Sequence, residues 1–185
     1  MGEQRKKHSR REHLNDFHLN IAGEYVYDGA LYACQNDDAK QRRSKRAVWG
    51  MAAILTVAVA AGGCIPAPGM QNCFYVLLPY LGEFLGAASV IWALAKLGTD
   101  WSTVREYNYK KSVAVLPVRT AVTAVFSLLG IVCELIFFFV NDHAGQTFFA
   151  LLYVLLKLIA LLSVLVLRAE IMQAEWDKLP KKNNS

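Results

Sequence analysis

Residues 118–140 read VRTAVTAVFSLLGIVCELIFFFV, and this stretch decides the class of fold. As an α-helix it would be about 35 Å long, which exceeds the roughly 30 Å of hydrocarbon in a bilayer. Lipid offers the backbone no hydrogen bonds, so a chain that crosses it must satisfy its own amides within a helix. The stretch therefore predicts a transmembrane helix.

Three more apolar stretches lie on either side of it, at residues 47–63, 74–97 and 147–167. The first is the shortest, and it is rich in Ala and Gly where the others are rich in Leu. Together they predict an all-α membrane protein, a bundle of four transmembrane helices. The chain then divides into a cytoplasmic head at residues 1–46, the bundle at 47–167, and a cytoplasmic tail at 168–185 that is expected to stay helical as far as Lys178.

The positive charges predict the orientation of the bundle. Of the 20 Lys and Arg residues, all but Lys157 lie in the head, in the tail or in the connection at 96–119. The connections at 64–73 and 141–146 contain none. Lys and Arg are retained on the cytoplasmic side, so we expect both termini in the cytoplasm and the protein in a plasma or cytoplasmic membrane. Lipid headgroups are then the expected partners of these charges, and nucleic acid is not.

The head carries two short patterns. In residues 14–21 the apolar side chains fall at helical spacing, which predicts a short amphipathic helix on the membrane surface. That face consists of Leu14, Phe17, His18 and Ile21. Residues 24–27 and 30–33 flank Asp28-Gly29, a dipeptide typical of tight turns, and so predict a β-hairpin.

Three ionisable residues fall inside the predicted spans: Glu83, Glu134 and Lys157. Such residues are costly in hydrocarbon and seldom face lipid, and all three lie between the predicted outer surface and the middle of the membrane. Two interpretations stay open. Lys157 and one Glu form a buried ion pair while the other Glu is protonated, or the three groups form a proton or ion site in a polar cavity.

Small and polar residues mark the faces that we expect inside the bundle. On the third span the stripe is Thr120, Thr123, Ser127, Gly130 and Glu134. On the fourth span it is Gln146, Ala150, Tyr153, Lys157 and Ala160. Gly82 and Gly86 form a close-packing motif on the second span, with Glu83 beside them. The first span offers Ala53, Thr56, Ala60 and Gly63 as its small face.

Cys64 and Cys73 flank the first outer connection, so they are candidates for a structural disulfide on the oxidising side. The chain has no Cys-x-x-Cys pair, no nucleophile motif, no phosphate-binding loop and no His pair at metal-ligand spacing. We therefore expect neither a cofactor nor a metal.

These observations favour a non-catalytic role as a membrane subunit or interaction protein. It would contact the bilayer and either a second copy of itself, through the face of Gly82 and Gly86, or a partner in a membrane complex. The alternative from another class is a proton- or ion-coupled transporter that uses Glu83, Glu134 and Lys157. An intramembrane enzyme has the least support, and we predict that the chain is not an enzyme.

Overall fold

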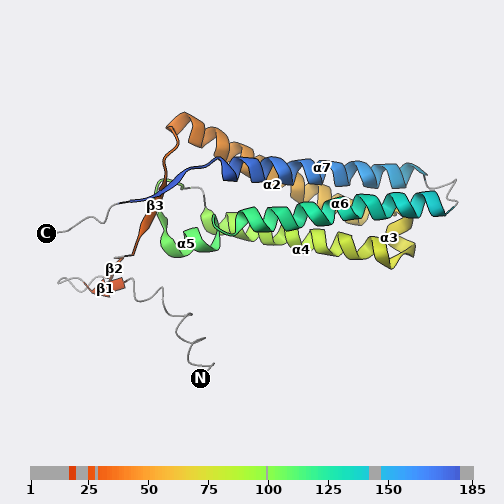
Figure 1. Ribbon diagram of the computed structural model, residues 1–185, viewed down its shortest axis with the longest axis horizontal. Helices are drawn as coiled ribbons and strands as arrows, with labels where there is room; N and C mark the ends of the chain where they lie inside the picture. Colours follow the sequence, from red (N-terminus) through yellow and green to blue (C-terminus); the bar gives the residue numbers. More distant parts are fainter. Residues whose placement is uncertain (1–16, 20–24, 28, 99, 142–146, 180–185) are drawn as a thin grey trace, which may run out of the picture.

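The computed structural model describes residues 17–19, 25–27, 29–98, 100–141 and 147–179. It is mostly helical, and four helices of this described part are long and apolar enough to cross a membrane. They are α2 (Asp38–Cys64), α4 (Phe74–Leu97), α6 (Leu116–Val140) and α7 (Thr147–Met172). The four helices lie along one another in a long bundle (Figure 1). The predicted helical bundle is thus confirmed at this level.

Inside the bundle, α7 packs against both α2 and α6, and α6 packs against α4, while α2 and α4 share fewer contacts. The inward stripe predicted on the third span is buried along its whole length, and so is the described part of the stripe on the fourth span. Gln146, the first member of the latter, lies outside the described residues. Large apolar side chains such as Leu85 (67% exposed) and Leu162 (61% exposed) point outward. An apolar exterior around a polar interior suits a lipid environment.

The small face predicted on the first span is wrong, because Ala53, Thr56 and Ala60 are exposed. The buried face of α2 instead carries larger apolar side chains, among them Val48 and Leu55. Alanine is only weakly apolar and fits both lipid and a helix contact, so it gives little information about which face is inside. The helix also begins before residue 47, and the border drawn between head and bundle falls within it.

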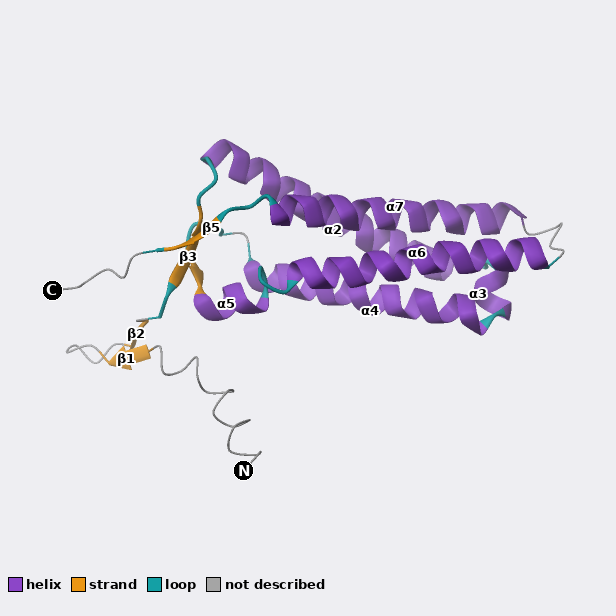
Figure 2. Cartoon of the chain, viewed as in Figure 1, coloured by secondary structure: helices purple, strands orange, loops and turns teal. Residues whose placement is uncertain are grey.

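A small sheet closes one end of the bundle, called here the sheet end (Figure 2). Its central strand is β3 (Leu31–Cys34), which pairs antiparallel with β4 (Val104–Arg105) on one side and β5 (Trp176–Lys178) on the other. Head, middle connection and tail each contribute one strand. Trp101 is buried between this sheet and the bundle, in a cluster that includes Leu97 and Ile171. The sheet and the helices therefore share one apolar core.

The strands overturn three predictions. Where the sequence predicts an amphipathic helix at 14–21, the described residues form a strand, β1 (Phe17–Leu19), which pairs with β2 (Tyr25–Tyr27) in a separate two-stranded sheet, and the rest of that stretch lies outside the described residues. The predicted hairpin is wrong, since β2 pairs backward with β1 while β3 pairs elsewhere. The helical tail ends at Met172 and gives way to β5. An isolated hairpin leaves both of its edges unpaired, whereas β3 gains a partner on each edge, and such distant pairing overrides local patterns.

Two short helices complete the described part. The helix α5 (Glu106–Lys111) lies at the sheet end, and α3 (Pro68–Asn72) lies at the opposite end, called here the α3 end (Figure 1). A proline stands in the first turn of α3, where its missing N–H costs no hydrogen bond. The loop that the sequence placed outside the bundle therefore folds back onto α4, α6 and α7.

Replacement of Trp101 tests whether the sheet and bundle share a core. Trp101→Ala removes a side chain that is 1% exposed, and we expect it to lower the free energy of unfolding by about 3–5 kcal/mol. Trp92→Ala is the matched control, because Trp92 is 63% exposed on the outside of α4. Thermal denaturation of the purified protein in detergent, followed by circular dichroism, measures both. Equal losses in the two variants would contradict a shared core.

Candidate functional site

The three ionisable side chains predicted inside the spans are buried, with exposed fractions of 0% for Glu83 and Glu134 and 2% for Lys157. They do not form a single cluster. The ammonium of Lys157 on α7 forms an ion pair with Glu83 Oε2 on α4. The hydroxyl of Ser127 on α6 donates a hydrogen bond of 2.6 Å to the other oxygen, Glu83 Oε1. One carboxylate thus joins three helices, and Glu83 rather than Glu134 is the partner of Lys157.

Aromatic rings complete the surroundings of the Lys157 ammonium. Its nitrogen lies 4.6 Å from the centre of the Tyr80 ring and 5.1 Å from the centre of the Tyr153 ring. The electron-rich faces of these rings favour a cation. The stem of the lysine lies beside Gly130, where a methyl group would stand in ordinary van der Waals contact, 3.6 Å from Lys157 Cε. The cation is therefore desolvated but well accommodated.

The helix α4 presents Glu83 inward because its buried residues recur at helical spacing. That face consists of Val76, Pro79, Glu83, Ala87 and Val90. Gly82 and Gly86 lie on its flank and face α6. A methyl group on Gly82 would overlap the Phe126 ring, and one on Gly86 would crowd Thr123. The two glycines therefore allow α4 and α6 to pack closely within one chain, and this face is already occupied by α6.

Glu134 forms a separate site near the α3 end. The backbone N–H of Gly69 in α3 donates a hydrogen bond of 3.4 Å to Glu134 Oε1. A side chain on Gly69 would overlap this carboxylate, so only glycine fits at this position in the observed arrangement. The other oxygen, Glu134 Oε2, has no hydrogen-bond partner among the described residues.

A second buried polar atom has no hydrogen-bond partner in the described part of the chain, the hydroxyl of Tyr153. A hollow of about 20 Å³ lies beside Glu134, between α6 and α7. It is lined by Glu134, Leu135, Phe138, Ala150, Leu151 and Val154. The hollow has the volume of about one water molecule, and its accessible lining is apolar. Glu134 thus has a free oxygen and a small adjoining space, which the Lys157–Glu83 pair lacks.

Sequence reasoning missed the contact of Gly69 with Glu134. The sequence offered one signal, the pair Pro68-Gly69, because proline favours the first turn of a helix and glycine tolerates close approach. It could not show that α3 would reach the carboxylate. Cys64 and Cys73 are both free cysteines in the structure, so their disulfide stays a prediction.

The chemistry of the site is limited. No three His, Cys, Asp or Glu side chains of the described residues come together in a group that could hold a metal. Comparison with known proteins adds no assignment, since no family model, no curated protein and no solved structure matches the chain. The function must therefore be argued from the geometry.

A double-mutant series tests whether Lys157 and Glu83 act as one unit. Glu83→Gln or Lys157→Met alone leaves a buried charge unpaired, which we expect to cost about 3–5 kcal/mol of unfolding free energy. The double variant removes both charges, keeps an acceptor for Ser127, and places a flexible thioether against Tyr80 and Tyr153. We expect it to be more stable than either single variant.

The measurement is the midpoint of unfolding in a titration from mild detergent to dodecyl sulfate. Coupling of the two residues is the difference between the effect of the double variant and the sum of the single effects. Simple additivity of the two losses would mean that the two residues do not act as a pair.

Proposed function

We propose that this chain is an integral membrane protein with four transmembrane helices, and that it acts as a non-catalytic subunit or interaction protein in a membrane complex. The exposed apolar side chains of all four helices support a lipid environment. The sheet end collects Lys and Arg residues, including Lys96, Arg119 and Arg168. Positively charged flanks are typical of the cytoplasmic side, so we place the sheet end in the cytoplasm.

The observation that carries this proposal is that the charges of Lys157 and Glu83 are fully paired inside the bundle. Both carboxylate oxygens of Glu83 are engaged, one by Lys157 and the other by Ser127. Both charges are also buried. A site that carries protons or ions has to exchange with water, whereas a buried carboxylate with both oxygens paired serves to fix the arrangement of helices.

The sheet end offers the better surface for a partner. The outer strands β4 and β5 each have one edge that pairs with no other described strand. Such edges bind extended segments of other proteins through main-chain hydrogen bonds. Asp177 and Lys178 on β5 are exposed there. A second copy of the chain is a further candidate partner, although the face of Gly82 and Gly86 is covered by α6.

Photocrosslinking in native membranes tests the interaction role. A photoreactive residue in place of Asp177 on β5, or of Tyr107 on α5, should give an adduct of one discrete mass. The control position is Leu165, which is exposed on the side of α7 and should face lipid. Mass spectrometry then identifies the adduct, and twice the mass of the chain would indicate self-association. Absence of adducts at both sheet-end positions, or equal adducts from Leu165, would contradict the proposal.

Glu134 supports a second candidate function, a proton- or ion-coupled transporter. Its Oε2 atom and the hydroxyl of Tyr153 are buried without a hydrogen-bond partner in the described chain. A group that binds and releases a proton or cation needs such an uncommitted oxygen and some adjoining space. If the protein is such a transporter, Glu134 alone binds and releases the proton or ion, and the Lys157–Glu83 pair keeps a structural role.

Carbodiimide labelling across a range of pH values separates the two candidates, with Glu83 as an internal control. For a structural bundle we expect neither carboxyl to react in the folded protein in lipid, because both are fully buried. Labelling of Glu134 but not of Glu83, with a midpoint near neutral pH and protection by a particular ion, would overturn the structural role in favour of transport. Glu134→Gln must abolish that labelling. Mass spectrometry of digested protein locates the modified residue.

A further inference from the structure

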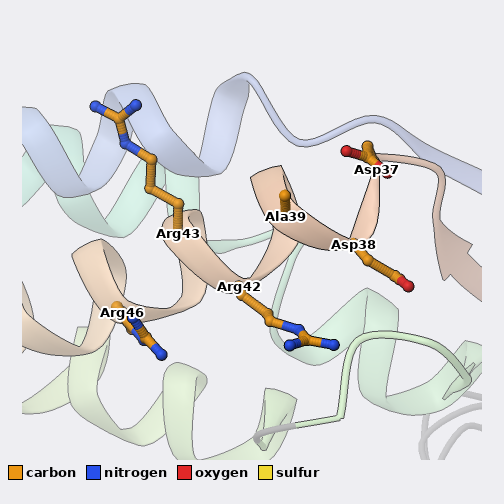
Figure 3. A pocket seen from close by; sticks show the side chains of 6 residues that line it. All are labelled: Asp37, Asp38, Ala39, Arg42, Arg43 and Arg46. Atoms are coloured by element: carbon orange, nitrogen blue, oxygen red, sulfur yellow. The ribbon is translucent and has the colours of Figure 1, made fainter.

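A groove of about 570 Å³ runs along the first turns of α2, at the sheet end (Figure 3). It is lined by Asp37, Asp38, Ala39, Arg42, Arg43 and Arg46. All three arginines are exposed. Figure 3 shows the side chains of Arg42 and Arg46 extending from the same side of the helix, as expected for residues one turn apart. The groove therefore presents the guanidinium groups of Arg42 and Arg46 on one side of the helix, while the Arg43 side chain extends from the other side.

These arginines differ from most other cations of the sheet end, which have partners. Arg119 donates a hydrogen bond of 2.6 Å to the carbonyl of Ser89, and Arg168 donates to the carbonyl of Pro117. Other lysines lie against a ring, a hydroxyl or a carboxylate, in the pairs Lys45–Trp101, Lys96–Trp92, Lys111–Tyr107 and Lys110–Glu106. Within the described residues, Arg42, Arg43 and Arg46 form no hydrogen bond and no ion pair.

Helix stability accounts for the position of one arginine at most, because Asp38 stands four residues before Arg42, whereas Arg43 and Arg46 have no acidic residue at that spacing. The partial positive charge at the beginning of the helix favours Asp38 and falls off within the first turn, before the arginines. On the neighbouring helix, Glu170 of α7 accepts a hydrogen bond of 2.8 Å from Ser44 and forms no ion pair with these arginines. Although Asp37 and Asp38 line the same groove, the three guanidinium groups form no ion pair among the described residues and remain available for an external anion.

We propose that this groove binds the phosphate group of an anionic phospholipid whose headgroup also carries hydroxyl groups. Guanidinium groups bind phosphate oxygens through paired, charge-assisted hydrogen bonds. The carboxylates of Asp37 and Asp38 at the start of the groove accept hydrogen bonds from hydroxyl groups. A lipid is favoured over a soluble phosphate because α2 turns apolar directly after Arg46, and Trp49, 36% exposed, follows as an interfacial aromatic residue. The proposal rests on the membrane placement above, but not on the subunit role.

Native mass spectrometry of the full chain in detergent tests this site, with dioctanoyl phosphatidylglycerol as the probe and dioctanoyl phosphatidylcholine as the neutral comparison. We expect one bound phosphatidylglycerol and an affinity that falls by about tenfold or more in Arg42→Gln/Arg46→Gln. Arg42→Lys/Arg46→Lys should fall similarly, because lysine keeps the charge and loses the paired geometry. This variant also keeps the positive flank of the helix, so it tests the site even if the glutamine variant does not fold.

Lys40→Gln/Lys178→Gln is the matched control, since it removes the same charge from exposed positions of the sheet end that do not line the groove. Its affinity should equal that of the wild type. An equal loss in this control, wild-type binding by the lysine variant, or equal binding of the two lipids would overturn the site in favour of diffuse attraction. Displacement by millimolar sn-glycerol phosphate would overturn the lipid as the source and assign the groove to a soluble phosphate. None of these results depends on whether photocrosslinks form.

Discussion

The contact between Lys157 and Glu83 constrains the rest of the bundle. A charge in hydrocarbon is tolerated only when a partner and hydrogen bonds replace the water that it has lost. Lys157 comes from α7, its carboxylate partner from α4, and the hydroxyl of Ser127 from α6. A shift of one residue along any of these helices rotates its side chain by about 100° and turns a charged or polar group towards lipid. The contact therefore fixes the rotation of three helices at once.

Close packing follows from this requirement, because the side chains reach each other only when the helices approach. Gly82 and Gly86 provide the space between α4 and α6, the first for the Phe126 ring and the second for Thr123. The helix α2 carries no charge into this cluster. It is held by apolar packing against its neighbours and by the hydrogen bond from Ser44 to Glu170 at the sheet end. Thus α4, α6 and α7 are joined by the ion pair and the hydrogen bond at Glu83, and α2 is held mainly by apolar packing.

Much of this arrangement could be predicted from the sequence, and the failures at the sheet and at Gly69 share a physical cause. Length and hydropathy predict the four helices, and the helical spacing of polar residues predicts the inward faces of α6 and α7, since lipid penalises polar groups strongly. Strands such as β4 and β5 could not be predicted, because their stability comes from pairing with β3, which is distant in sequence. The contact of Gly69 with Glu134 could not be predicted for the same reason. A single hydrogen bond between residues distant in sequence leaves no periodic pattern.

The two ends of the bundle satisfy their polar groups differently, and this difference separates the candidate functions in space. At the sheet end, Arg119 and Arg168 donate hydrogen bonds to carbonyl groups of neighbouring helices. These bonds join α6 to α4 and α7 to α6. At the α3 end, Glu134 has one long hydrogen bond of 3.4 Å and one oxygen without a partner in the described chain. A partner or lipid that binds at the sheet end therefore does not compete directly for the Glu134 carboxylate, because the two sites lie at opposite ends of the bundle.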